Sequence, residues 1–165
     1  MHMCCAPCST YPVKILKEKN IDFTGYFYNP NIHPYEEYER RRNTVKEFSE
    51  IVNIDVIYND EYLEREWLEY KDNNRCKMCY NLRIEKTALY ASLNGYNAFT
   101  STLLISPYQN HELIKELGNK YAKKYGIEFY YEDFRPYFRE GQSIAREYNL
   151  YRQKYCGCII SFNSK

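Results

Sequence analysis

Seven cysteines are the residues of this 165-residue chain with the most obvious chemistry. They fall into three groups that are far apart in the sequence: Cys4, Cys5 and Cys8; Cys76 and Cys79; and Cys156 and Cys158. An odd number of cysteines in an intracellular chain argues against a disulfide framework. The pattern instead favours metal binding or thiol redox chemistry.

Cys76 and Cys79 are separated by two residues, and on a turn this spacing lets both sulfurs face one metal ion. A redox dithiol of the thioredoxin type and two unconnected thiols are the alternatives. Cys4 and Cys5 are adjacent, and adjacent cysteines seldom form a disulfide with each other because the geometry is strained. Both can still be sulfur ligands of a metal.

Spacing alone leaves zinc and an iron–sulfur cluster open. A structural zinc site made of cysteines normally uses two complete C-x-x-C pairs, and the closely spaced cysteine run of ferredoxins is absent here. Seven thiols exceed what a closed structural site needs. This surplus favours a working redox centre.

The elements that must position these cysteines alternate between strand and helix. We expect strands over residues 23–28, 55–58, 98–105 and 127–131. We expect helices over residues 9–19, 35–51, 61–70, 75–93, 111–125 and 143–148. Strands separated by such helices form βαβ units, so the sequence predicts one α/β domain over residues 1–165, a parallel sheet between two helical layers. Because only three residues precede Cys4, the first strand should be short or ragged.

Ligands of an open parallel sheet bind beyond the carboxyl ends of its strands. Cys4 and Cys5 would follow the first strand there, and Cys76 would begin a helix, where exposed amides stabilise a thiolate. The three cysteine groups can therefore meet at one rim. The first turn reads Cys-Cys-Ala-Pro-Cys-Ser and has no glycine to let a phosphate approach, so ATP-driven chemistry is not expected.

Composition sets further limits. A hydrophobic content of 44% is enough for a core, and a net charge of +1 means that a polyanion would have to bind a local basic patch. No apolar run approaches the roughly 20 residues of a membrane span, and no secretion leader is evident, so we expect a cytoplasmic protein without a membrane partner. Most of the 20 tyrosines are expected to be packing residues.

Five segments together resemble one family. They are HMCCAPCS at 2–9, FYNPNIHP at 27–34, CKMC at 76–79, TSTLLISPY at 100–108 and YRQKYCGC at 151–158. In this order they resemble the QueH family of cobalamin-independent epoxyqueuosine reductases. The resemblance implies a HUP-like (Rossmann-like) α/β domain with a 4Fe-4S cluster. It also implies reduction of the epoxide of epoxyqueuosine at the wobble position of tRNA, with electrons from an unidentified donor.

The resemblance also implies roles for single residues. Cys4, Cys5, Cys76 and Cys79 would be the cluster ligands. The remaining tail thiols, Cys156 and Cys158, would form a second redox pair or bind a second, mononuclear metal. Cys8 matches the family motif, but we assign it no role beyond packing as a small buried residue.

Reduction of an epoxide to an alkene consumes two electrons and two protons and releases water, so an acid must protonate the leaving oxygen. Asp133, Tyr108 and His33 are the candidates. Each also has a structural interpretation: Asp133 as a helix cap, Tyr108 as a packing residue and His33 as a hydrogen-bonding loop residue. Arg152 and Gln153 lie beside the tail cysteines and could position the substrate.

Contact with RNA needs positive charge and stacking surfaces. The triplet Arg40, Arg41 and Arg42 could supply the charge, although a solvated helix face is an equally good interpretation. Further basic and aromatic candidates are Lys120, Lys123, Lys124, Arg135, Arg139, Tyr38, Tyr121, Tyr125 and Tyr137. Two rival functions are a zinc-bearing nucleic-acid-binding module without catalysis and a thiol–disulfide enzyme that acts on proteins.

Overall fold

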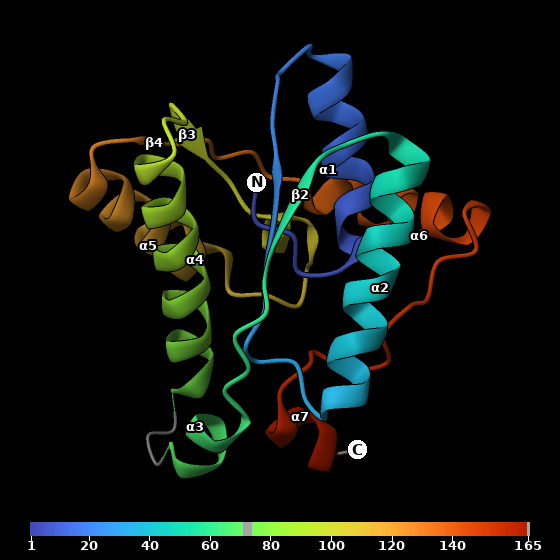
Figure 1. The fold of residues 1–165 in the computed structure, drawn as a ribbon, viewed down its shortest axis with the longest axis vertical. Coiled ribbons are helices and arrows are strands. Elements are labelled where there is room, and N and C mark those ends of the chain that lie inside the picture. Colours follow the sequence, from blue (N-terminus) through green and yellow to red (C-terminus); the bar gives the residue numbers. More distant parts are fainter. Residues whose placement is uncertain (71–73, 165) are drawn as a thin grey trace.

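The computed structural model describes residues 1–70 and 74–164, and within them it is an α/β protein with short parallel strands (Figure 1). The strands are β1 (Gly25–Tyr28), β2 (Val56–Asn59), β3 (Ala98–Phe99) and β4 (Glu128–Phe129). The α-helices are α1 (Ala6–Glu18), α2 (Tyr35–Val52), α3 (Glu64–Glu69), α4 (Arg75–Leu93), α5 (His111–Tyr125), α6 (Phe138–Glu147) and α7 (Ile159–Asn163). Two short 3-10 helices are η1 (Thr102–Ile105) and η2 (Arg135–Tyr137).

The strands form two parallel pairs, β1 with β2 and β3 with β4. His2 joins them, because it makes parallel bridges to both Tyr26 and Ser101. Its amide donates to Thr100 O at 2.8 Å and its carbonyl accepts from Thr102 N at 2.9 Å. The spatial order is therefore β2, β1, His2, β3, β4, and the expectation of a short first strand is confirmed.

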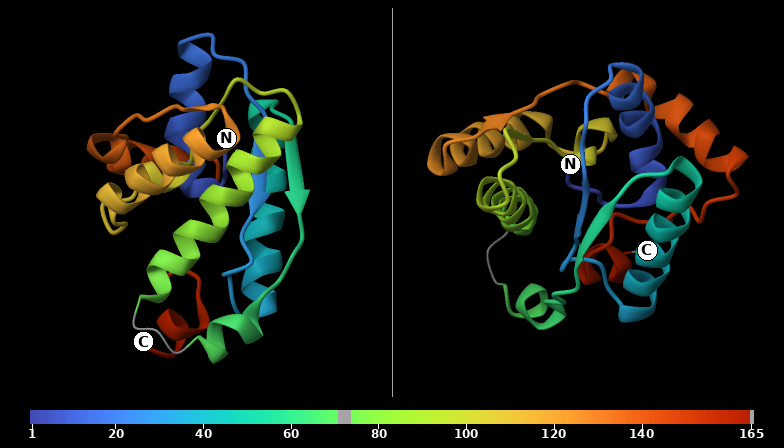
Figure 2. Two further views of the ribbon diagram at one scale, coloured as in Figure 1. Left: turned by 90° about the vertical axis from the view of Figure 1, so that its left-hand side faces the viewer. Right: turned by 45° about the horizontal axis from the view of Figure 1, so that its top comes forward.

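Helices pack on both sides of these strands. In Figure 1, α4 and α5 lie on one side and α1, α2 and α6 on the other. Helix α4 packs against α5, and α1 packs against α6. Figure 2 shows α3 and α7 near each other at one end of the molecule, where they are in contact. None of the helices in the described residues is long and apolar enough to cross a membrane.

Two apolar clusters account for most of the core. The first joins α4 and α5 to the start of α1 and includes Ile84, Leu104 and Phe134, and the second joins β1 to α2 through Phe27 and Phe48. The first cluster includes residues of β3 and β4, and the second includes residues of β1 and β2. Because both clusters reach α1, they fix the helix that begins beside Cys4 and Cys5.

The expected strand over residues 98–105 is wrong beyond Phe99. The chain leaves the sheet there, and Thr102–Ile105 form a 3-10 turn whose residues are all nearly fully buried. The Ser101 hydroxyl stabilises this turn by accepting a hydrogen bond from Leu103 N at 3.1 Å. The residue pattern of an apolar run of this length is the same for a buried strand and for a buried turn, so sequence alone does not distinguish them. The helix expected at 143–148 also begins earlier, at Phe138.

Candidate metal and redox site

A cavity of about 300 Å³ lies beyond the carboxyl ends of β1 and of the His2 bridge. Seven parts of the chain line it: the start of α1, the loop after β1, α2, α4, the 3-10 turn η1 with its following loop, α6, and the C-terminal segment. Its lining residues include Cys4, Cys5, Cys8, Asn29, Asn31, Arg41, Arg83, Tyr108, Gln109, Arg152, Gln153, Lys154 and Cys156. The cavity is therefore at the edge of the sheet where the sequence predicts a site.

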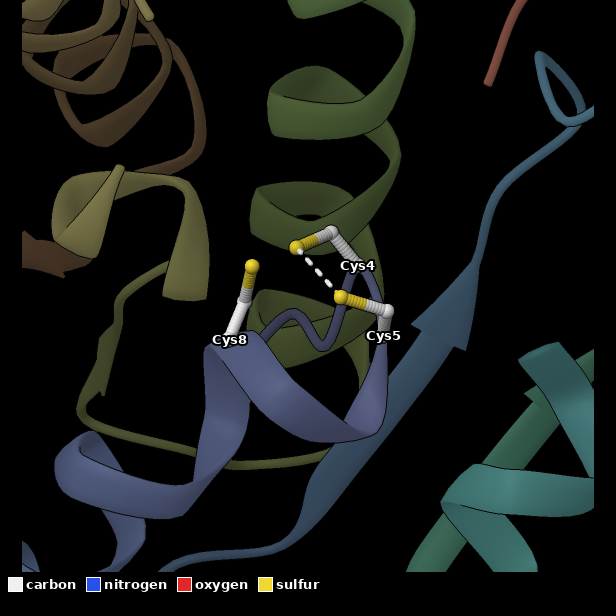
Figure 3. A group of neighbouring side chains, drawn as sticks. All are labelled: Cys4, Cys5 and Cys8. Atoms are coloured by element: carbon white, nitrogen blue, oxygen red, sulfur yellow. Dashed lines mark hydrogen bonds between the residues drawn. The ribbon is translucent and has the colours of Figure 1, made fainter. Parts of the chain in front are cut away.

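Cys4, Cys5 and Cys8 form a compact sulfur group at the start of α1 (Figure 3). Their Sγ atoms all lie within 4.8 Å of one another, and those of Cys4 and Cys5 are 3.9 Å apart. Cys5 is the N-cap residue of α1, and Pro7 in the first turn fits the helix start because no backbone donor is needed there. One turn of helix then brings Cys8 beside the other two thiols.

The three thiols of this group do not have equal acidity. Hydrogen bonding with Cys5 and Cys8 holds the pKa of Cys4 well below its usual range. The Thr102 hydroxyl also donates to Cys4 Sγ, at 3.3 Å. The same thiol hydrogen bonds to Cys4 raise the pKa values of Cys5 and Cys8. Cys4 is therefore the most acidic of the three thiols.

Cys76 and Cys79 lie in the first turn of α4. The side chain of Asn74 caps this helix by accepting from Lys77 N at 3.3 Å. Cys76 is exposed, whereas Cys79 is buried, and burial raises the pKa of Cys79 to about 12. One turn later, Arg83 Nη2 donates to Cys79 Sγ at 3.0 Å. The sequence therefore folds this C-x-x-C pair onto a helix start, as expected.

The C-terminal segment carries the third cysteine group over the cavity. Arg41 on α2 holds it by donating from Nη1 to Cys156 O and from Nη2 to Tyr155 O, both at 3.0 Å. Cys156 is exposed and lines the cavity, and Cys158 is buried in a small cluster with Trp67 and Cys79. This cluster places the tail beside the start of α4.

All seven cysteines are free thiols in the structure, which leaves every sulfur available as a ligand. Among the described residues, one group of three or more cysteine, histidine or acidic side chains has its ligand atoms this near to one another. It consists of Cys4, Cys5 and Cys8. Soft sulfur donors of this kind suit zinc or an iron–sulfur cluster. The residues present therefore fit a metal centre, and Cys8, to which we assigned only packing, belongs to the sulfur group.

Comparison with known proteins decides the family. A family model described as "Epoxyqueuosine reductase QueH" matches residues 1–164. The chain belongs to the QueH family.

Several curated members of the QueH family carry the name Epoxyqueuosine reductase QueH. The protein from Dehalococcoides mccartyi is 35% identical, covering 98% of this chain and 90% of its own length. The protein from Thermotoga maritima is 36% identical, covering 98% of this chain and 88% of its own length. The protein from Histophilus somni is 38% identical, covering 98% of this chain and 70% of its own length.

The candidate acids of this QueH chain lie in different surroundings. Tyr108 lines the cavity and is 83% exposed, with its ring edge against Phe138. Asp133 is absent from the described cavity lining, and its hydrogen bonds with Arg135 hold its pKa at about 2. His33 is buried, and both of its ring nitrogens are engaged, with Pro30 O and Ile159 N. Of the three, Tyr108 is the one that lines the cavity.

The arginine triplet does not form one face of α2, because successive helix residues point about 100° apart. Arg40 is exposed and stacks on Tyr151 at 4.9 Å, and Arg42 pairs with Asp60 at 2.7 Å. Arg41 is 3% exposed and pairs with Glu37 at 2.8 Å. Arg41 is therefore paired with a carboxylate, and it also lines the cavity.

Three of the five more distant basic candidates also contact neighbouring side chains. Lys124 pairs with Glu85 at 2.6 Å, and Lys120 lies over the Tyr121 ring at 4.9 Å. Arg135 pairs with Asp133 at 2.6 Å. Lys123 and Arg139 are exposed. These side chains lie on several elements, whereas Arg152 and Lys154 are exposed at the cavity itself.

Sequence reasoning missed two asparagines and one arginine of the cavity. Asn29 Nδ2 donates to Met3 O at 2.8 Å, which fixes the amide, and its buried Oδ1 has no partner in the described structure. Asn31 Oδ1 is buried and unpartnered in the same way. Their signal was the polar run directly after a strand, which marks the binding edge of a parallel sheet. Arg83 had no such signal, because a basic residue in a long helix usually faces solvent.

Proposed function

We propose that this chain reduces the epoxide of epoxyqueuosine in tRNA to the alkene of queuosine. The observation that carries the proposal is the cavity, where sulfurs from both ends of the chain line one space beside the exposed Tyr108. Proteins of the same family that bear the name epoxyqueuosine reductase support it. The reaction takes up two electrons and two protons and releases the epoxide oxygen as water.

Within this proposal, Cys4, Cys5, Cys76 and Cys79 bind a 4Fe-4S cluster. The soft sulfur donors suit such a cluster, and when bound it supplies electrons one at a time. Cys76 and Cys79 interact electrostatically with the tail thiols Cys156 and Cys158. Binding of one cluster by the proposed ligands would also require α1 and α4 to hold their cysteines around a shared centre. The parallel strands and flanking helices accord with a HUP-like, three-layer single domain over residues 1–165.

The remaining residues of the cavity have separate tasks in this proposal. Cys156 and Cys158 hold electron equivalents as a thiol pair or bind a second metal. Tyr108 donates a proton to the leaving oxygen, because its hydroxyl is accessible at the cavity. Gln153 fixes the tail against Cys5 through a hydrogen bond of 3.1 Å.

Arg152 and Lys154 are exposed beside the cavity and contact the phosphates of the tRNA anticodon loop in this proposal. A wobble nucleoside can be splayed out of an unpaired loop into a pocket at modest energetic cost. The reaction takes place in the cytoplasm with a separate electron donor. Tyr108 offers a ring on which a loop base can stack.

Expression of the gene in a bacterial strain that accumulates epoxyqueuosine tests this function. We expect total tRNA from the complemented strain to contain queuosine and to lose epoxyqueuosine, as measured by mass analysis of the nucleosides. A matched strain expressing the Tyr108→Phe variant should convert more slowly, because only the hydroxyl is removed. Persistence of epoxyqueuosine with abundant wild-type protein would contradict the proposal.

A further inference from the structure

Arg83 is a buried cation in contact with the cysteine site. Its side chain comes from α4, one turn after Cys79, and is only 3% exposed. Its Nη2 donates to Cys79 Sγ at 3.0 Å, and its Nε donates to Cys79 O at 3.2 Å. The same residue lines the cavity together with Cys4 and Cys156. One guanidinium therefore faces a member of each of the three cysteine groups.

No carboxylate in the described part of the chain lies within 4.0 Å of Arg83. The other buried arginine, Arg41, differs in this respect, because Glu37 pairs with it at 2.8 Å. A buried charge is costly unless it is paired, so Arg83 needs an anionic partner. The sulfurs beside it can supply this negative charge when they are bound as thiolate ligands of a metal.

The guanidinium of arginine keeps its proton in proteins. Arg83 therefore carries a positive charge while it is enclosed beside the cysteine sulfurs.

We propose that Arg83 is the counter-cation of the sulfur site and makes the bound cluster easier to reduce. The inference rests on the proposed function, because the group that gains the electron is the cluster held by these cysteines. Each electron accepted adds one negative charge to the site. A nearby buried cation stabilises the more negative, reduced form more than the oxidised form. Hydrogen bonds to ligand sulfurs act in the same direction.

Arg83 is thus a positioning and charge-tuning residue that acts through Cys79. A surface arginine could not have the same effect, because water and salt screen exposed charges. The enclosed position, at 3% exposure, is what gives a single charge its influence on the potential. Replacement by lysine would keep the charge and lose the planar fork that donates to both the sulfur and the carbonyl of Cys79.

The test is a reduction titration of the reconstituted protein with dithionite, followed by absorbance and electron paramagnetic resonance. Wild type is compared with Arg83→Gln, which removes the charge, and Arg83→Lys, which keeps it. Lys86→Gln is the matched control, because it removes one charge from the same helix at a side chain that lies over Tyr28, 5.7 Å from the ring centre. Iron content and melting temperature are recorded for every variant.

We expect the potential to fall clearly in Arg83→Gln, to fall less in Arg83→Lys and to match wild type in Lys86→Gln. Loss of the cluster from Arg83→Gln with retention in Arg83→Lys would equally support a role of the charge. Equal potentials in all proteins, or equal cluster loss in both Arg83 variants, would overturn the inference and leave the proposed function standing. A wild-type chain that takes up no iron and sulfide would overturn both.

Discussion

The side-chain amide of Gln153 donates a hydrogen bond to the Sγ of Cys5 at 3.1 Å, across 148 residues of sequence. The same nitrogen lies 3.7 Å from Cys8 Sγ. This hydrogen bond joins the C-terminal segment to the start of α1, and Cys156 lines the same cavity as the N-terminal cysteines. The first prediction concerns the removal of this hydrogen bond.

Replacing Gln153 with leucine keeps the size of the side chain and removes its donor. We expect kcat/KM for the tRNA substrate to fall about tenfold. Cys5 would be a thiolate as a cluster ligand, a hydrogen bond to a charged group contributes about 1.5–3 kcal/mol, and about 1.4 kcal/mol corresponds to tenfold. Iron content should stay near the wild-type value. Steady-state assays with iron determination check this. Wild-type turnover in Gln153→Leu would show that the hydrogen bond has no part in catalysis.

The iron content of serine variants distinguishes cysteines that bind the cluster from cysteines that do not. Under the proposed ligand set, Cys76→Ser should lose most of its iron, because serine is a hard and poorly acidic replacement for a thiolate. Cys8→Ser should keep it, although Cys8 lies within 4.8 Å of Cys4 and Cys5. Iron and sulfide analysis after anaerobic reconstitution measures both. The opposite result, with iron lost only from Cys8→Ser, would make Cys4, Cys5 and Cys8 the ligand set.

Arg41 is predicted to be needed for stability. Arg41→Met leaves the carboxylate of Glu37 buried without its cation, which we expect to cost about 3–5 kcal/mol in the free energy of unfolding. Arg65→Met is the control, because Arg65 is 83% exposed and should change stability by less than about 1 kcal/mol. Urea unfolding of the apoprotein measures both values. Adding Glu37→Gln to Arg41→Met should recover part of the stability, and no recovery would argue against an unpaired charge as the cause.

Arg152 and Lys154 are predicted to bind phosphates of the tRNA. Changing both to alanine should weaken tRNA binding and flatten its salt dependence, with a change in slope of about 0.7–0.9 for each phosphate that is no longer neutralised. Lys17 and Lys19 are the matched control pair, because they lie at the C-terminal end of α1, whereas the cavity is at its N-terminal end. Binding is measured by fluorescence anisotropy over a range of salt concentrations. A slope that changes in the control pair alone would move the RNA surface elsewhere.

All three histidines are buried, and they predict how stability depends on pH. Burial is the main cause that lowers the pKa of His2 to about 4, and it also lowers the pKa values of His33 and His111. The unfolded chain therefore takes up protons more readily than the folded chain as pH falls below about 6.5, the ordinary pKa of histidine. We expect the free energy of unfolding to fall between pH 7.5 and pH 5.5, roughly the window of histidine titration. His111→Asn should have a shallower dependence, and an unchanged slope would mean that this residue does not contribute.

Much of this fold follows from local sequence patterns. Helices α4 (Arg75–Leu93) and α5 (His111–Tyr125) begin and end at the residues that the sequence predicts. The structure adds that Asn74 and Asn110 cap their first turns. The βαβ alternation also predicts a site at the carboxyl edge of the strands, and the cavity lined by Cys4, Cys5 and Cys8 lies there. The prediction of a strand through Ile105 was wrong because a buried 3-10 turn and a buried strand can have the same run of apolar residues. Here the turn is capped by Ser101.

The details of the site depend on contacts that sequence spacing does not encode. Cys8 joins Cys4 and Cys5 only because α1 begins at Ala6 rather than at Ser9, so Cys8 lies inside the first helical turn. The role of each arginine in the triplet depends on which one faces the tail. Tertiary packing gives that place to Arg41 and leaves Arg40 exposed.

The most direct measurement is a single-turnover assay with the purified chain. The protein is reconstituted anaerobically with iron and sulfide, mixed with tRNA that contains epoxyqueuosine and with dithionite, and the nucleosides are analysed by mass. The account predicts a product lighter by one oxygen atom than the substrate, and no such product from a Cys156→Ser variant that has kept its iron. Unchanged epoxyqueuosine in the presence of iron-loaded, tRNA-bound wild-type protein would contradict it.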